Sequence, residues 1–140
     1  MKRSASAVWK GGLQDGRGTV STESGILSGA PYNFKMRFEN EKGTNPEELV
    51  AAAHAACFSM ALSKILADAG MTPDSIDTKA TVSLDKGDAG FSVTSSHLDT
   101  TVTIPNANKA AFDEAVQKAK AGCPISKLLN ATITLSANLV

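Results

Sequence analysis

The sequence predicts an α+β fold in which a mainly antiparallel sheet accompanies one long, buried central helix. Residues 44–70 carry helix signals at both ends and are apolar or small on almost every side between them. Short stretches with period-two alternation precede this segment, and longer alternating stretches and a second helical pattern follow it. Such groups of strands and helices are typical of the α+β class. At 140 residues, we expect a single domain over residues 1–140.

The central helix is marked at both ends. Asn45 offers an N-cap oxygen, and Pro46 suits the first helical position, where no amide hydrogen is needed. Glu47 and Glu48 place negative charge against the positive end of the helix dipole. Gly70 offers the left-handed conformation that commonly closes a helix.

A helix that is apolar or small all round is buried on most sides. One small sheet and one further helix do not provide enough cover, so we predict an intimate homodimer in which a second copy covers the rest. A membrane span is the competing interpretation, because about 20 apolar residues would suffice. His54, Lys64 and Asp68 interrupt the run, so we expect no membrane partner.

The N-terminal third predicts a three-stranded meander. Residues 4–10 alternate as a short strand, and glycine-containing turns separate them from a second strand near residues 19–22. Tyr32 to Phe38 alternates apolar and polar residues, which predicts a half-buried strand with Arg37 on its polar side.

The C-terminal half predicts two long strands, two helices and a last strand. Residues 76–84 and 91–104 alternate, and a change of phase in the second stretch indicates a bulge near Ser95 and Ser96. Residues 108–121 predict a helix that Gly122 ends. A short helix then begins at Pro124, and residues 131–139 alternate as the final strand.

Charge and cysteine content restrict the possible functions. Fourteen basic residues balance fourteen acidic ones without a basic cluster, so we expect no nucleic-acid partner. The N-terminus lacks the continuous apolar region of a signal peptide, which predicts a cytoplasmic protein. Two widely separated cysteines then favour redox or nucleophilic chemistry. Among the cysteines and histidines, only His54 and Cys57 fall at metal-ligand spacing, so we expect no metal site.

Cys57 is the first candidate for that chemistry. A free cysteine in a helix is often a buried, inert residue, which is the alternative interpretation. His54 and Lys64 share its helical stripe, and a nearby positive group would lower the pKa of the thiol. His97 lies in a strand with nothing reactive beside it, and we interpret it as structural.

Cys123 is the second candidate. It precedes a helix that begins with Pro124, and the positive end of a helix dipole favours a thiolate. A plain N-cap in a turn is the alternative. Two cysteines in such positions suggest an attacking and a resolving thiol, although the spacing is not Cys-x-x-Cys.

Arg37 and Glu47 have simpler explanations as a solvated strand residue and a dipole-compensating helix residue. Glu47 and Cys57 are ten residues apart on one helix, a rise of about 15 Å. They cannot both touch one small substrate within a subunit. A site that includes both would therefore be shared between two subunits.

Several motifs together resemble the OsmC/Ohr family, and more narrowly its osmotically inducible branch. The resemblance extends along essentially the whole chain. The matching segments are Gly-Thr-Val-Ser-Thr-Glu-Ser-Gly at 18–25, Arg-Phe-Glu at 37–39, Glu-Lys-Gly-Thr-Asn-Pro-Glu-Glu-Leu at 41–49, Ala-Ala-His-Ala-Ala-Cys-Phe-Ser-Met-Ala-Leu at 52–62 and Lys-Ala-Gly-Cys-Pro-Ile-Ser at 120–126.

The resemblance implies a thiol-dependent peroxidase without cofactor or metal. Cys57 would match the peroxidatic cysteine, which forms a sulfenic acid, and Cys123 the resolving cysteine, which forms a disulfide that an external thiol or dithiol reduces. Arg37 would stabilise the thiolate and the peroxide oxygens, and Glu47 would orient Arg37 through a bidentate ion pair. Arg17 is a further candidate, because the sister branch uses an arginine in that early loop. The implied fold is an intertwined homodimer with active sites at the subunit interface.

We therefore expect an enzyme of oxidative and osmotic stress defence that reduces organic hydroperoxides and, more slowly, hydrogen peroxide. Phe58, Met60 and Phe38 would provide an apolar lining that favours alkyl or lipid hydroperoxides. A non-enzymatic redox sensor or binding protein that uses the same two cysteines is the alternative.

Overall fold

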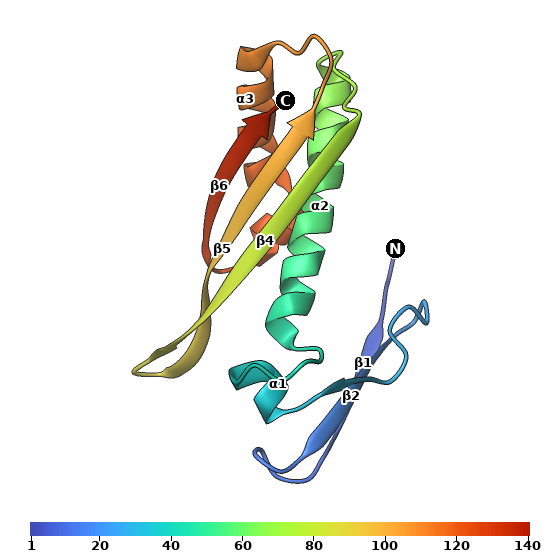
Figure 1. Cartoon of the computed structure of the whole chain (residues 1–140), viewed down its shortest axis with the longest axis vertical. Coiled ribbons are helices and arrows are strands. Elements are labelled where there is room, and N and C mark those ends of the chain that lie inside the picture. The colour runs from blue at the N-terminus through green and yellow to red at the C-terminus, as the bar shows by residue number, and fades with distance from the viewer. The chain divides into compact units, whose positions relative to one another are not determined.

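The computed structural model describes all of residues 1–140, which form two compact units, residues 1–49 and residues 50–140. The division falls in the first turn of the long helix. Each unit contains one three-stranded sheet (Figure 1). The expectation of a single domain over residues 1–140 stays a prediction.

Residues 1–49 form the predicted meander. Strands β1 (Ala5–Lys10), β2 (Arg17–Thr22) and β3 (Ala30–Tyr32) pair antiparallel in that order. Helix α1 (Phe34–Phe38) follows directly. All side chains of β1 are exposed, so this unit has little interior of its own.

The strand predicted over Tyr32 to Phe38 is wrong beyond Tyr32. Asn33 caps a helix there instead, because its side chain accepts a hydrogen bond of 2.8 Å from the Met36 amide. Phe34 and Phe38 then lie one turn apart, with ring centroids separated by 4.8 Å. Apolar residues at every second position include pairs four residues apart, so this short stretch satisfies both the strand and the helix period.

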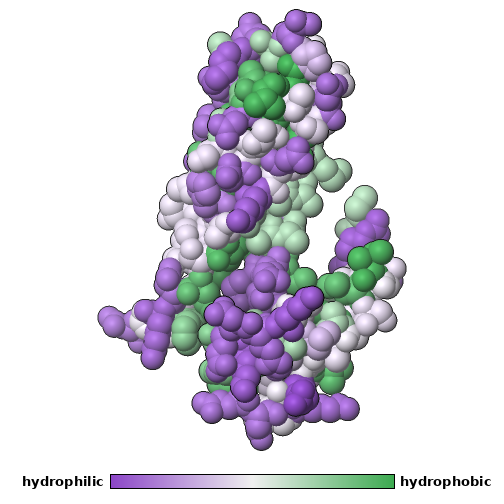
Figure 2. All heavy atoms as spheres, viewed as in Figure 1, coloured by the Kyte–Doolittle hydropathy of each residue, from purple (hydrophilic) through white to green (hydrophobic).

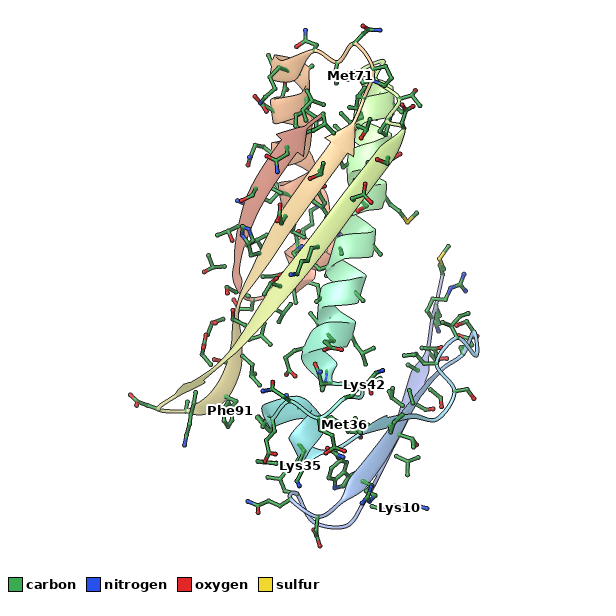
Figure 3. The ribbon with its side chains drawn as sticks, in the orientation of Figure 1. Lys10, Lys35, Met36, Lys42, Met71 and Phe91 are labelled. Atoms are coloured by element: carbon green, nitrogen blue, oxygen red, sulfur yellow. The ribbon has the colours of Figure 1, made fainter.

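The long helix α2 (Pro46–Asp68) begins and ends as predicted. The Glu48 amide donates to the Asn45 side chain at 2.8 Å. Gly70 has a φ of 74°, which allows the Met71 amide to donate to the Leu66 carbonyl at 2.9 Å. Met71 is itself buried, and Figure 3 labels it just beyond the end of the helix.

In a single chain, α2 is buried along one stripe only, and its burial on most sides by a second copy stays a prediction. Its buried residues recur every four positions along one stripe, and they are His54, Phe58, Leu62 and Leu66. By length and composition alone, α2 could cross a membrane. However, three residues of the stripe belong to the hydrophobic core of residues 50–140, so α2 is a core helix.

The second sheet contains β4 (Ser75–Gly87), β5 (Gly90–Thr103) and β6 (Thr132–Leu139), in that order. β4 and β5 are antiparallel, whereas β6 runs parallel to β5. The predicted bulge is present, because Ser83 pairs with Ser95 while Leu84 pairs with Val93. Thr94 is therefore the extra residue.

Helices α3 (Lys109–Gly122) and α4 (Pro124–Leu128) complete this unit. Helices α2 and α3 lie on one face of the sheet (Figure 1), and polar residues gather on the opposite face (Figure 2). The core between the helices and the sheet is built mainly from α2, β5 and α3. Its largest side chains include Phe58, Leu62, Leu98 and Phe112.

Candidate functional site

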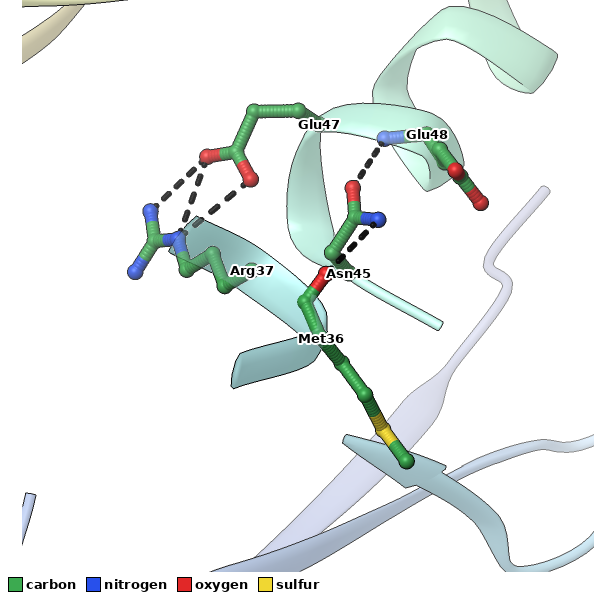
Figure 4. Close-up of polar contacts among 5 residues, drawn as sticks. All are labelled: Met36, Arg37, Asn45, Glu47 and Glu48. Carbon is green, nitrogen blue, oxygen red and sulfur yellow. Dashed lines mark hydrogen bonds and ion pairs between the residues drawn. The ribbon is translucent and has the colours of Figure 1, made fainter. Parts of the chain in front are cut away.

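The structure brings Arg37 and Glu47 together within residues 1–49. The Arg37 Nη2 donates to Glu47 Oε1 at 2.8 Å, and Nε lies 3.3 Å from both carboxylate oxygens (Figure 4). The Glu47 side chain is largely buried, with 15% exposed, while Arg37 is 38% exposed. The guanidinium is thus oriented on one edge and remains accessible to solvent.

Local capping explains why these two side chains meet. Arg37 lies on α1, which Asn33 starts, and Glu47 lies in the first turn of α2, which Asn45 caps. The Asn45 side-chain amide also donates to the Met36 carbonyl at 3.5 Å (Figure 4). This contact links the end of one helix to the start of the next. The bidentate pair that the family resemblance implied is therefore present.

An aromatic cavity of about 280 Å³ opens beside Arg37. Its lining also includes Trp9, Leu13, Tyr32, Phe34 and Phe38. Trp9 and Tyr32 are in ring contact, with centroids 5.4 Å apart. Gly18 is required under these rings, because a Cβ there would lie 2.4 Å from the Tyr32 ring. The cavity combines a cationic group with an apolar wall.

The second pair, Cys57 and Cys123, lies in residues 50–140. Both cysteines are free, Cys123 is fully buried and Cys57 is half-buried. Their thiols share a hydrogen bond, and the backbone amide of Ile125 donates to Cys57. Cys123 is the N-cap of α4 as predicted, but its side chain makes no capping hydrogen bond. Its sulfur is directed to Cys57 instead.

The expectation that His54 and Lys64 lower the pKa of Cys57 is wrong. Burial raises the pKa of the Cys57 thiol, and the neighbouring Cys123 raises it further, whereas the Ile125 amide opposes this change. Lys64 donates to Asp68 at 2.6 Å. Burial also lowers the pKa of His54, so its ring is neutral and brings no positive charge.

His54 is nevertheless fully buried and fully hydrogen-bonded. Its Nδ1 lies 2.7 Å from the Ser96 hydroxyl, and its Nε2 lies 2.8 Å from the Ser126 hydroxyl. The ring therefore connects α2 to β5 on one side and to α4 on the other. The sequence pattern indicated no partner for His54 and neither of the two serines. Only Ser126 has a signal in the sequence, because it follows Cys123 by three residues as His54 precedes Cys57 by three.

The structure also places the remaining candidates. Phe58 lies in the core with no exposed surface, so the expectation that it lines a substrate cavity is wrong. Met60 is 77% exposed on α2, and Phe38 lies at the aromatic cavity. Arg17 is exposed at the start of β2. His97 lies 2.6 Å from the Thr134 hydroxyl on the neighbouring strand.

Comparisons with known proteins agree with the family resemblance of the sequence. The family described as OsmC-like protein matches residues 39–138. Peroxiredoxin OsmC of Escherichia coli strain K12 is 60% identical over 133 residues, covering 95% of this chain and 93% of that protein. The organic hydroperoxide resistance protein OhrB of Bacillus subtilis strain 168 is 28% identical over 123 residues, covering 87% and 88%. The crystal structure of Bacillus subtilis OhrB superposes with a TM-score of 0.69 at 26% identity and covers 98% of each chain.

Proposed function

The chain belongs to the OsmC-like protein family, and from that premise we propose that it is a thiol-dependent peroxidase for organic hydroperoxides, with slower turnover of hydrogen peroxide. One observation carries the proposal. Two reduced cysteines, distant in sequence, share a hydrogen bond inside a packed core, and a backbone amide points at one of them. A nucleophilic thiol next to a resolving thiol is the arrangement that such a peroxidase needs.

In the first step, the Cys57 thiolate attacks the terminal oxygen of the hydroperoxide. The O–O bond breaks, and the leaving alkoxide takes up a proton and departs as an alcohol. With hydrogen peroxide, the leaving product is water. Cys57 is oxidised to a sulfenic acid, and the amide of Ile125 supports the negative charge on its sulfur before the attack.

In the second step, the Cys123 sulfur attacks the Cys57 sulfenic acid. An S–S bond forms, the S–O bond breaks, and the hydroxide leaves with the Cys123 proton as water. An external thiol or dithiol then reduces the disulfide and is itself oxidised to a disulfide. We place this cycle in the cytoplasm, in defence against oxidative and osmotic stress.

In this proposal, Arg37 stabilises the Cys57 thiolate and the peroxide oxygens, and Glu47 orients it. The bidentate contact and the accessible edge of the guanidinium support these roles. Because Glu47 and Cys57 are about 15 Å apart along one helix, Arg37 would act on Cys57 of a partner subunit. The raised pKa of Cys57 in one chain supports a need for such an external positive charge.

A homodimer follows from the same reasoning. The side of α2 away from its buried stripe is exposed and carries mostly small residues, which form a pale green band in Figure 2. Ala52, Ala56, Met60 and Ser63 are exposed there. A surface of this kind allows a second helix to approach closely and removes apolar area from water.

The preference for organic hydroperoxides rests on the aromatic cavity beside Arg37. Its apolar wall would hold an alkyl or aryl group while the guanidinium faces the peroxide oxygens. Hydrogen peroxide has no alkyl or aryl group, so it makes no apolar contacts with the cavity lining.

Peroxide consumption with a dithiol as reductant tests the proposal. We expect wild type to turn over cumene hydroperoxide with a larger kcat/KM than hydrogen peroxide, and Cys57→Ser to be inactive. Faster turnover of hydrogen peroxide would contradict the substrate preference. Stoichiometric oxidation of wild type without turnover would contradict the enzyme and support the redox sensor.

A further inference from the structure

The buried histidine of α2 and the cysteine pair form two parallel connections between the same two segments. His54 contacts Ser126, and Cys57 contacts Cys123. On α2, His54 precedes Cys57 by three residues. On the second segment, Ser126 follows Cys123 by three residues. The polar contact therefore fixes the same register that brings the two sulfurs together.

Cys123 is fully buried and its amide donates to the Ala119 carbonyl at the end of α3, but the helix that follows it has few anchors. Helix α4 has only five residues, and none of them is buried. Ile125 alone among them packs against the core, and Leu128 is 75% exposed. A single-turn helix is not stable by itself, so contacts such as the one to Ser126 set its position.

The chemistry of the ring restricts what His54 can do. Both nitrogens lie within hydrogen-bonding distance of serine hydroxyls, and no nitrogen is left to accept a proton from either thiol. A neutral imidazole donates through one nitrogen and accepts at the other, and each serine can supply the matching partner. Ser96 is fully buried on β5, so the ring is anchored on the sheet side. His54 is thus fixed in orientation and is not a general base.

We propose that His54 is a positioning residue for the resolving step, which holds the first turn of α4 through Ser126 and so keeps Cys123 in line with the Cys57 sulfenic acid. This inference rests on the peroxidase cycle proposed above. Its specific claim is that the hydrogen bond to Ser126 matters more for disulfide formation than for the attack on peroxide. Cys57 itself lies on the long helix, so α4 affects the first step only through the contact of the Ile125 amide with Cys57.

The test separates the two steps in a single turnover. Reduced protein is mixed with one equivalent of cumene hydroperoxide, quenched at increasing times with a sulfenic-acid trap, and analysed by intact mass. The variants are Ser126→Ala, which removes the hydroxyl, Ser126→Thr, which keeps it, and His54→Asn. Thr134→Val is the matched control, because it removes the hydroxyl that contacts the other histidine, His97, in the same unit.

We expect Ser126→Ala to slow disulfide formation about tenfold, the change expected from loss of one partly buried hydrogen bond, and to slow sulfenic acid formation by less, because only the Ile125 amide connects α4 to the first step. Ser126→Thr should restore the wild-type rate, and Thr134→Val should keep it. His54→Asn should slow the same step as Ser126→Ala.

Three results would overturn the inference. Disulfide formation at the wild-type rate in Ser126→Ala would remove the positioning role while leaving the peroxidase intact. Equal slowing in Thr134→Val would make the effect one of general stability. Wild type that forms sulfenic acid but no disulfide would overturn both the resolving role of Cys123 and this inference.

Discussion

Residues 1–49 and residues 50–140 each contain a three-stranded sheet, but they differ in how much they bury. The only buried residues of the first unit are Gly16 and Gly18, whereas the second has a continuous core around Phe58 and Phe112. The thiol pair lies in the packed unit, and the arginine pair lies in the open one. A thiol that must be held in place needs a core, while an arginine that must meet a substrate needs an accessible position.

The largest expected difference between the units is in stability. Leu62→Ala removes a fully buried side chain and should lower the free energy of unfolding by about 2–5 kcal/mol. Ile26→Ala, at a residue 86% exposed in the first unit, should change it by less than about 0.5 kcal/mol. Urea denaturation measures both. A comparable loss in Ile26→Ala would mean that residues 1–49 gain a core in the assembled protein.

Glycine substitutions test the packing of the open unit. A Cβ at Gly18 would lie 2.4 Å from the Tyr32 ring and 2.8 Å from the Trp9 ring. Gly18→Ala should therefore cost about 1–3 kcal/mol and disturb the aromatic cavity. Gly122→Ala in the second unit meets open space at the end of α3 and should be neutral or stabilise the protein by up to about 1 kcal/mol. Thermal unfolding distinguishes the two, and equal effects would contradict this account of the cavity.

Glu47→Gln tests whether the arginine pair serves the reaction. The amide keeps the shape but loses the charge that orients Arg37, so we expect kcat/KM for cumene hydroperoxide to fall about tenfold. The ion pair is partly exposed, so stability should change by less than about 1 kcal/mol and the dimer should persist in sedimentation. Asp68→Asn removes an exposed ion pair on the same helix and should leave kcat/KM unchanged. Unchanged kinetics in Glu47→Gln would remove Glu47 from the site.

The smallest expected effect is on how stability changes as the pH is lowered. Burial lowers the pKa of His54 below its ordinary value of 6.5, so the unfolded chain binds a proton before the folded one does. The contribution of neutral His54 to the free energy of unfolding is fully present above pH 6.5. It is lost as the pH falls from 6.5 toward the pKa of His54 in the folded protein, by at most about 1.4 kcal/mol per pH unit. His54→Asn should show a shallower decline in urea titrations from pH 7 to pH 5. An equal decline in both proteins would contradict a neutral buried ring.

The elements of residues 50–140 could be predicted from sequence because their signals are long or specific. Asn45, Pro46 and Gly70 mark both ends of α2, and Gly122 marks the end of α3. The phase change in β5 located its bulge within two residues. By contrast, the stretch around Arg37 is too short for periodicity to separate a helix from a strand, and the Asn33 cap decided it.

The candidate site was predictable in its residues but not in its electrostatics. Helical spacing placed His54 and Lys64 on the same face of α2 as Cys57, but spacing alone does not show what each side chain contacts. His54 is neutral between two serines from β5 and α4, and Lys64 is paired with Asp68. Such partners come from distant segments, so only the folded chain identifies them.

Intact-mass analysis of the reduced protein after one equivalent of an alkyl hydroperoxide shows whether Cys57 and Cys123 react as a peroxidatic and a resolving thiol. We expect wild type to lose two mass units as a Cys57–Cys123 disulfide forms. Cys123→Ser should stop at a sulfenic acid, and Cys57→Ser should not react. If wild type keeps its reduced mass, the adjacent thiols are structural and the peroxidase account is wrong.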